Sequence, residues 1–367
     1  MGGQAEGNRA VSLAAGKLLL LGAWLLLLGV ASGFGPPTFG DGDPFVQPMG
    51  SAELASLGAM PPVPGTVRAV AAVVMDGASG HTLVSRNADA RLAPASLTKM
   101  MTALVALDRA SLSEPIVATE RSRSEPSVIG LDPGDTLSLE SMLYGLLLMS
   151  GNDAAQAIAE SIGGGSIERF VGWMNERAAT MGLKNTRFAN PSGLDQAGHY
   201  SSARDMAEIA RAVMAEPRLA QIVGTRRHVI EGPPLYVFTN SNPLLGSYPG
   251  LDGVKTGFTD DAGRCFAASV TRDGGRLITV VLNSPNIAGE AFTLLEAGFA
   301  ISRPVPLSVA RVGYAGLREA VQPQLAGPVA NLAGWELPFL RAFTRRMGDN
   351  SFETTVSLAG RPLGRWR

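Results

Sequence analysis

The hydrophobic pattern at both ends of the central part of the chain predicts β-strands. Residues 67–75 are rich in β-branched residues and alanine, and the turn-forming cluster 76–80 separates them from a second extended run, 81–85. Two further runs of this kind, 265–271 and 277–282, flank the tight turn Asp273-Gly274-Gly275. Short apolar runs joined by Gly- and Asp-containing turns are typical of antiparallel hairpins. We therefore expect an antiparallel sheet built from both ends of this region.

Between these strands the apolar positions follow a helical period. Leu97, Met100, Met101 and Leu104 recur at the spacing of one helical face, and the helix they define begins at or beside Ser96. Because the segment 100–107 carries almost no charge, this helix should be central and buried. We expect the other helices at residues 139–149, 154–162, 170–181, 290–301 and directly after Ser202, which resembles an N-cap, and a loop at 188–200.

Composition shifts divide the chain into four parts. Residues 1–33 contain Arg9 and Lys17 before an apolar run and then small residues, the pattern of an export signal peptide or signal anchor. Residues 34–65 are rich in Pro and Gly and read as a linker. Residues 66–302 hold the predicted helices and strands, and residues 303–367 form a small C-terminal module or tail. The fold class is α/β in the broad sense (α+β), and the protein is expected outside the cytoplasm, secreted or anchored to the membrane.

The composition excludes several classes of function. The chain has 367 residues, is 46% hydrophobic and carries a net charge of -1, so it has no electrostatic signature of a nucleic-acid-binding protein. Cys265 is the single cysteine and is expected in a strand core, while His81, His199 and His228 are scattered and match no zinc or hydrolase motif. No phosphate- or dinucleotide-binding motif occurs, so we expect no metal and no other cofactor.

The start of the central helix combines a serine with a lysine in a way that suggests nucleophilic catalysis. Ser96 and Lys99 are three residues apart and so share a helical face, which brings an amine close to a hydroxyl. A buried lysine loses its proton more readily and can act as the base for serine. The helix N-terminus would also favour the oxyanion formed when a carbonyl is attacked. Alone, this pattern is weak, because a chain of this length contains it by chance about once.

Two further motifs strengthen this interpretation. Ser150-Gly151-Asn152 lies between two predicted helices, and Lys255-Thr256-Gly257 follows a turn-rich segment. This trio is shared by class A β-lactamases and penicillin-binding proteins. With 87–89, 94–102, 190–195 and 252–259 added, the chain resembles the low-molecular-mass penicillin-binding proteins, the serine D-alanyl-D-alanine carboxypeptidases of peptidase family S11, over roughly residues 66 to 300.

The resemblance implies a fold and a set of roles. The fold is the β-lactamase/transpeptidase-like one, an antiparallel sheet flanked by helices with a helical subdomain and the active site between them. In this family Ser96 would be the acylated nucleophile, Lys99 its base and Ser150 a proton relay to the leaving amine. The residues that bind substrate would be Asn152, Lys255, Thr256, Gly257 and Phe258, with the N–H groups of Ser96 and Phe258 as oxyanion hole.

The implied substrate is a peptidoglycan stem peptide that ends in D-Ala-D-Ala, and β-lactam antibiotics would be covalent inhibitors. Lys255, taken as a strand-edge side chain with little core packing, would meet the terminal carboxylate. Some family members place an arginine after the last core strand for this purpose, but residues 283–290 contain none. This departure leaves open which residue besides Lys255 binds the carboxylate.

Three other functions compete with the carboxypeptidase. A DD-endopeptidase would use the same residues. A class A β-lactamase also needs a glutamate in the pattern E-x-x-L-N, which is absent between Asn152 and Lys255. A non-catalytic cell-wall binding protein on the same fold would not need its site residues to be intact, as they are here at Ser96, Lys99, Ser150 and Lys255.

Overall fold

The structure is a computed structural model, and it describes residues 63–123, 126–232, 234–306, 329–333, 336, 340–347, 352–358 and 361–366. The predicted signal segment 1–33 and nearly all of the linker 34–65 lie outside these residues. Among the described helices, none is long and apolar enough to cross a bilayer.

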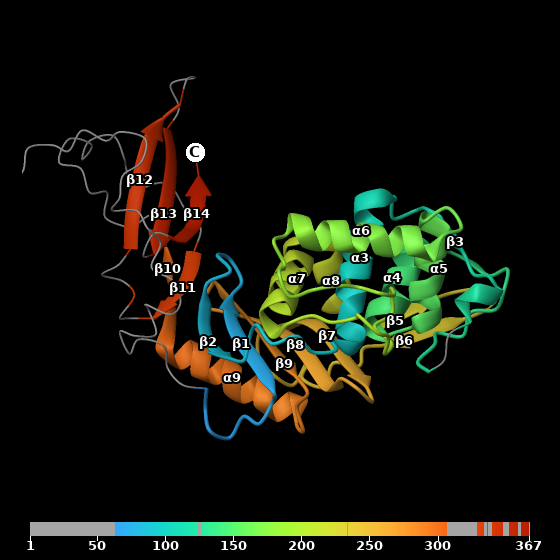
Figure 1. The fold of residues 1–367 in the computed structure, drawn as a ribbon, viewed down its shortest axis with the longest axis horizontal. Helices are drawn as coiled ribbons and strands as arrows, with labels where there is room; N and C mark the ends of the chain where they lie inside the picture. The colour runs from blue at the N-terminus through green and yellow to red at the C-terminus, as the bar shows by residue number, and fades with distance from the viewer. Residues whose placement is uncertain are drawn as a thin grey trace, which may run out of the picture. The chain divides into compact units, whose positions relative to one another are not determined.

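A five-stranded antiparallel sheet forms the centre of the fold (Figure 1). Its strand order is β2-β1-β9-β8-β7, so β7 lies at one edge. The bounds are Ala71–Asp76 for β1, Thr82–Arg86 for β2, Leu251–Thr259 for β7, Gly263–Arg272 for β8 and Gly275–Leu282 for β9. The β1–β2 and β8–β9 hairpins were both predicted and are confirmed. Strands from the two ends of the region meet where β1 pairs with β9.

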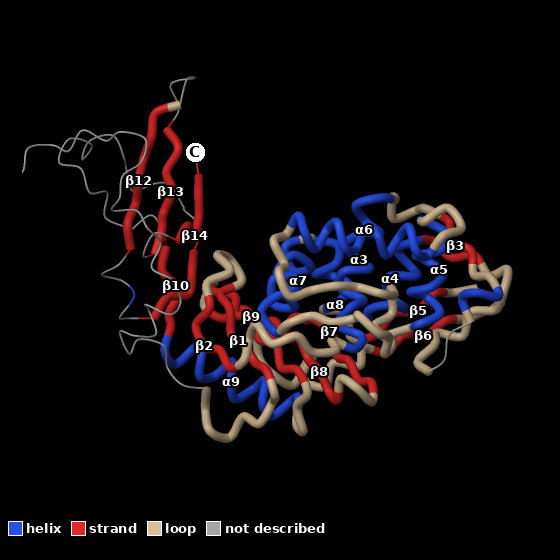
Figure 2. The backbone as a smooth tube through the Cα atoms, in the orientation of Figure 1, coloured by secondary structure: helices blue, strands red, loops and turns tan. Residues whose placement is uncertain are grey.

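Alternate residues of the sheet belong to two different cores. Val73 and Met75 pack with the helical side of the molecule, whereas Ala72 and Val74 pack with Leu294 and its neighbours on α9 (Ile287–Ile301). Figure 2 shows α9 on one side of the strands and the other helices on the opposite side. Because side chains alternate along a strand, both faces of the sheet must be apolar. This explains the nearly continuous hydrophobic runs in the sequence.

The remaining helices form the predicted helical part. They are α3 (Lys99–Arg109), α4 (Leu139–Leu148), α5 (Asn152–Ile162), α6 (Ile167–Thr180), α7 (Ala203–Ala215) and α8 (Pro217–Val223). The N-cap predicted at Ser202 is confirmed, since its side chain accepts a hydrogen bond from the Asp205 N–H. Helix α8 was not predicted, although its Pro217 in the first turn is a recognisable start signal.

Helix α3 is central, as expected. Its residues from Lys99 to Ala106 are buried, and it packs against α4, α5, α6 and α7. Met100 and Met101 are 0% exposed. A helix enclosed on every side holds the residues at its start rigidly, which suits a catalytic site.

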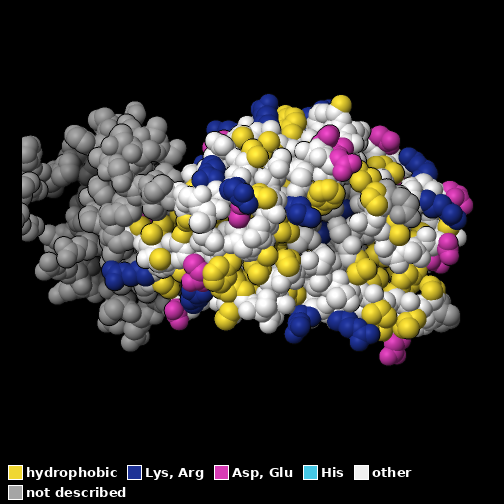
Figure 3. All heavy atoms as spheres, turned by 90° about the horizontal axis from the view of Figure 1, so that it is seen from below, with side chains coloured by type: hydrophobic (Ala, Val, Ile, Leu, Met, Phe, Trp, Pro, Cys, Tyr) yellow, Lys and Arg dark blue, Asp and Glu magenta, His cyan; other side chains and the backbone are white. Residues whose placement is uncertain are grey.

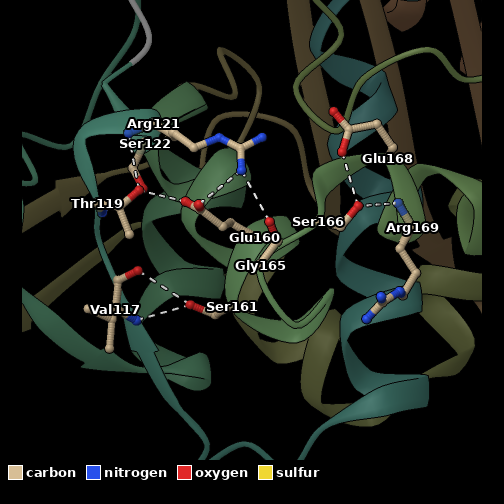
Figure 4. A network of polar contacts seen from close by, with 10 residues as sticks. All are labelled: Val117, Thr119, Arg121, Ser122, Glu160, Ser161, Gly165, Ser166, Glu168 and Arg169. Carbon is tan, nitrogen blue, oxygen red and sulfur yellow. Dashed lines mark hydrogen bonds and ion pairs between the residues drawn. The ribbon is translucent and has the colours of Figure 1, made fainter.

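Short strand pairs and polar contacts complete the helical part. The pairs are β3 (Pro115–Val117) with β4 (Thr136–Ser138), and β5 (Arg227–Ile230) with β6 (Tyr236–Thr239). The segment after β3 is held at the end of α5 by Glu160, whose carboxylate accepts hydrogen bonds from Thr119 and Arg121 (Figure 4). These contacts fix the connection that leads toward the loop at residue 126.

After α9 the chain forms further antiparallel strands. They are β10 (Ser302–Pro306) with β11 (Val329–Ala333), and β12 (Leu340–Arg346), β13 (Phe352–Leu358) and β14 (Arg361–Trp366) in a three-stranded sheet. Asn331 donates from its backbone N–H and from Nδ2 to Asp76 at the end of β1, and buried Glu336 contacts His81. The division of the chain at residue 303 stays a prediction.

Candidate active site

Ser96 lies in a tight turn at the start of the central helix. Residues Ala95–Thr98 form a 3-10 turn that leads directly into α3, so the predicted helix start is confirmed. Ala95, immediately before the serine, has a φ of 49°, which is unfavourable for a residue with a side chain. Such strain persists only where surrounding packing enforces it, and Ala95 is 0% exposed.

The amine of Lys99 meets the hydroxyl of Ser96. Its Nζ donates to Ser96 Oγ at 2.9 Å, to Asn152 Oδ1 at 2.7 Å and to the carbonyl of Ser192 at 2.6 Å. Burial holds the pKa of Lys99 well below its usual value, the charge of Lys255 lowers it further, and Asp153 opposes the shift. A lysine whose proton is easily lost, within hydrogen-bond reach of a serine, is the arrangement that can activate a serine hydroxyl as a nucleophile.

The second motif forms the connection between α4 and α5. Ser150 has a φ of 65° and faces the same cleft as Ser96. Asn152 is buried instead: its Oδ1 accepts from Lys99, and its Nδ2 donates to the carbonyl of Pro126. In this arrangement the amide of Asn152 positions Lys99 and the 126 loop, so its predicted contact with substrate would require it to exchange these partners.

The third motif lies on the edge strand β7. Thr256, Gly257 and Phe258 line the cleft, and Phe258 is 62% exposed. A Cβ on Gly257 would lie 2.9 Å from the backbone nitrogen of Ser96, so only glycine allows the strand to approach the nucleophile this closely. An edge strand also leaves alternate backbone groups unpaired, and these can hydrogen-bond an extended peptide.

Lys255 differs from expectation. It lies on the edge strand, but its side chain is only 1% exposed and its Nζ donates to the Thr256 carbonyl at 2.9 Å. Burial lowers the pKa of Lys255 to about 7. The expectation that this lysine contributes little to packing is therefore wrong, because its side chain is enclosed beneath the strand.

The cleft that joins these groups has a volume of 740 Å³. The described residues that line it are Ser96, Pro126, Ser127, Met149, Ser150, Ser241, Pro243, Thr256, Gly257, Phe258, Arg264, Pro285, Asn286, Ile287 and Ala288. They come from the start of α3, the 126 loop, the α4–α5 connection, the connection between β6 and β7, β7, β8 and the start of α9. Seven segments of the described chain therefore converge on one site.

Several residues that support the site were not identified from the sequence. Buried Asp153 accepts hydrogen bonds from the backbone N–H groups of Ile129, Gly130 and Leu131, and so shapes the loop beside the cleft. Its place directly after the second motif was the only available signal. Among the described residues, no cluster of His, Cys, Asp and Glu could hold a metal ion.

His199 supports the turn that carries the nucleophile. Its Nδ1 accepts from the Ala189 N–H at 3.0 Å, so the proton lies on Nε2, which bonds Thr98 Oγ1 at 2.8 Å. Burial lowers the pKa of His199 to about 4, so the ring is neutral at physiological pH. It is a positioning residue whose role no short motif would reveal.

The fold and this geometry are those of a serine hydrolase in which a lysine lies beside the serine. Comparison with known families gives the particular one: the D-alanyl-D-alanine carboxypeptidase (Peptidase_S11) model matches residues 58–286. The chain therefore belongs to this family, as its sequence motifs indicated.

Individual relatives agree. The chain is 41% identical over 224 residues to D-alanyl-D-alanine carboxypeptidase DacF of Bacillus subtilis (strain 168), covering 59% of this chain and 57% of that protein. It is 37% identical over 242 residues to D-alanyl-D-alanine carboxypeptidase DacB2 of Mycobacterium tuberculosis, covering 63% of this chain and 82% of the relative. The match to the Bacillus relative thus spans little more than half of that protein.

Solved structures show the same fold. The Streptomyces K15 DD-transpeptidase superposes with a TM-score of 0.61 at 32% identity, covering 64% of this chain and 98% of that one. A D-alanyl-D-alanine carboxypeptidase from Mycobacterium tuberculosis H37Rv superposes with a TM-score of 0.62 at 32% identity, covering 78% and 99%. The predicted β-lactamase/transpeptidase-like fold is confirmed.

Proposed function

We propose that this protein is a serine-type D-Ala-D-Ala carboxypeptidase that removes the terminal D-alanine from peptidoglycan stem peptides. The observation that carries the proposal is the 2.9 Å contact between Lys99 Nζ and Ser96 Oγ at the floor of an open cleft. Such a pair can transfer an acyl group without any cofactor. Family membership supports the choice of substrate and the ability to bind β-lactams.

The proposed reaction assigns one step to each of these groups. Once Lys99 is neutral, its two remaining N–H groups can still donate to Asn152 and Ser192, and its lone pair can take the proton of Ser96 Oγ. That oxygen attacks the carbonyl between the two D-alanines, and the N–H groups of Ser96 and Phe258 receive the oxyanion. The C–N bond then breaks, and Ser150 relays a proton to the departing D-alanine. Water attacks the resulting ester of Ser96 and regenerates the hydroxyl.

The same proposal places the protein where peptidoglycan lies, outside the cytoplasm. Residues 1–33 would direct export and would either be cleaved or remain as a membrane anchor. On the face drawn in Figure 3, charged side chains of both signs are scattered among neutral ones. This is the surface expected when the partner is a peptide held in a cleft rather than a polyanion.

The test is digestion of muropeptides with the purified protein, followed by mass spectrometry. A carboxypeptidase converts pentapeptide stems to tetrapeptide stems and leaves cross-links intact. Cleavage of cross-links would instead favour the endopeptidase, and transfer to an added amine would favour the transpeptidase activity named for the Streptomyces relative.

Ser96→Ala is the matched control for this experiment. The variant should release no D-alanine and take up no fluorescent penicillin, since the acyl acceptor is missing. Its stability should change by about 1 kcal/mol or less, because a residue at a helix start tolerates alanine. Labelling that persists in Ser96→Ala would rule out this serine as the nucleophile.

A further inference from the structure

We propose that Arg264 on β8 binds the terminal carboxylate of the substrate peptide. This inference rests on the function proposed above and deepens it, because it assigns the carboxylate end of the cleft to one side chain. The residues after the last core strand, 283–290, supply no arginine for this purpose.

The strand register places Arg264 beside the substrate-binding strand. Arg264 pairs directly with Phe258, and the next pair on the same face is Thr256 with Phe266. Side chains at directly paired positions project from the same face of a sheet, and diagonal neighbours are within reach of a long side chain. Thr256, Phe258 and Arg264 all line the cleft. The arginine therefore belongs to the same wall as the third motif.

Arg264 also supplies the charged side chain in the described lining of the cleft. Among the described residues that line the cleft, the others are neutral, and Arg264 is exposed. Its guanidinium takes part in no hydrogen bond or ion pair found among the described residues, unlike Arg272 and Arg276, which are bound to Glu296 and Asp252. A cation that faces an open cleft and has no carboxylate partner within the protein can bind a carboxylate of the ligand.

The alternative cation, Lys255, is less suited to direct contact. Its ammonium is buried below the strand and already donates to the Thr256 carbonyl. Burial lowers the pKa of Lys255 to about 7, so its charge is partly lost at neutral pH, whereas a guanidinium remains charged. Lys255 can add to the local field, but Arg264 can reach the ligand.

Hydroxyl groups next to Arg264 complete a site for a carboxylate. Thr256 Oγ1 and Ser241 Oγ lie 2.9 Å apart, and both residues line the cleft. One of these hydroxyls donates to the other, which leaves a second proton free for a ligand oxygen. The planar guanidinium can bind both oxygens of a carboxylate at once. A terminal D-alanine carboxylate would thus be held by a cation on β8 and a hydroxyl on β7.

The experiment compares two substrates and four proteins. The substrates are a stem-peptide analogue that ends in D-Ala-D-Ala and the same peptide with its terminal carboxylate amidated. The proteins are the wild type, Arg264→Ala, Arg264→Lys and the control Arg303→Ala, which removes an exposed arginine on β10. The release of D-alanine or D-alaninamide gives kcat/KM for each combination of protein and substrate. Labelling with saturating fluorescent penicillin measures the fraction of protein with an intact active site.

We expect the kcat/KM of Arg264→Ala to fall about 10- to 100-fold on the carboxylate substrate, which is the range for loss of one charge-assisted contact. On the amide, which lacks this contact, kcat/KM should fall less than about 3-fold. Arg264→Lys should recover part of the loss because it keeps the charge, and Arg303→Ala should match the wild type. Equal losses on the two substrates, or no loss with the carboxylate, would overturn the assignment of Arg264 while leaving the proposed function intact. A wild-type protein that neither takes up penicillin nor releases D-alanine would overturn both.

Discussion

At the scale of single residues, the site contains two lysines that are buried close to one another. Lys99 is 0% exposed and Lys255 is 1% exposed, and the charge of the second lowers the pKa of the first. An uncompensated buried ammonium is costly, so the fold favours their neutral forms. The same burial that costs stability at low pH prepares Lys99 to act as a base near neutrality.

Lys99→Arg should abolish rapid acylation although arginine is also a basic residue. A guanidinium cannot give up its proton at accessible pH and so cannot serve as the base for Ser96. Loss of general-base catalysis corresponds to a decrease of about 10²- to 10⁴-fold. The rate of labelling by fluorescent penicillin measures it, with Lys184→Arg at an exposed position as control. A rate within 10-fold of the wild type would assign the base to another group.

Lys255 should make stability depend on pH. Its pKa is about 7 in the folded protein against its ordinary 10.5, so between these values the unfolded chain binds a proton that the folded chain does not. The free energy of unfolding should therefore rise with pH across this window, and Lys255→Met should flatten the rise. Urea unfolding at a series of pH values tests this, with exposed Lys184→Met as control. Identical slopes for the wild type and Lys255→Met would show that the ammonium is not buried in solution.

At the scale of elements, the site depends on loops held against rigid helices. The connection between α4 and α5 places Ser150 in the cleft, and the next helix supplies Asp153, whose carboxylate accepts from three consecutive backbone N–H groups of the 129–131 segment. A buried carboxylate satisfied by backbone donors fixes both the helix start and the loop. Asp153 therefore holds the segment 129–131, and the adjoining wall of the cleft is held by Asn152, which donates from Nδ2 to the Pro126 carbonyl and from its backbone N–H to the Ser127 carbonyl.

Asp153→Asn should loosen this wall and shift the pH profile. The amide keeps one acceptor but turns an NH₂ group toward backbone donors, so we expect a loss of about 2–3 kcal/mol in stability. Because the Asp153 charge raises the pKa of Lys99, its removal should move the onset of penicillin labelling to lower pH. Exposed Asp132→Asn is the control for both measurements. An unchanged melting temperature would contradict the structural role of Asp153, and an unchanged onset would contradict its influence on Lys99.

At the scale of the whole molecule, the cleft and the C-terminal strands use different strands of the sheet. The cleft includes the edge strand β7 and its neighbour β8, whereas the described contacts of the C-terminal strands reach Asp76 at the end of β1, His81 just before β2 and the Arg276 carbonyl on β9. The described lining of the cleft includes no carboxylate that could activate a deacylating water. In the proposed mechanism Ser96 forms an acyl-enzyme, and the described lining contains no counterpart of the glutamate with which class A β-lactamases hydrolyse theirs.

β-Lactams should therefore inhibit this protein rather than be destroyed by it. Acylation of Ser96 should give an adduct that persists and is detectable by intact-protein mass spectrometry. Turnover of a chromogenic cephalosporin should stay far below the ~10 per second typical of enzymes. Ser96→Ala is the control for the adduct. Rapid hydrolysis without a persistent adduct would instead favour a β-lactamase.

The local parts of the structure were determined by the sequence itself. The two hairpins, the buried face of α3 and the N-cap at Ser202 follow from patterns within about ten residues, where spacing decides which side chains meet. The three motifs likewise predicted Ser96 with Lys99, because a contact one helical turn apart needs only local geometry.

Only the tertiary structure decided how the motifs interact. Asn152 binds Lys99 from 53 positions away, His199 supports Thr98 from 101 positions away, and the burial of Lys255 depends on everything that packs beneath β7. The proposed role of Arg264 depends on the strand register, which places this residue opposite Phe258. Burial and distant contacts arise from packing of the whole chain, and so do the pKa shifts that follow from them, because desolvation and charge act through space rather than along the sequence.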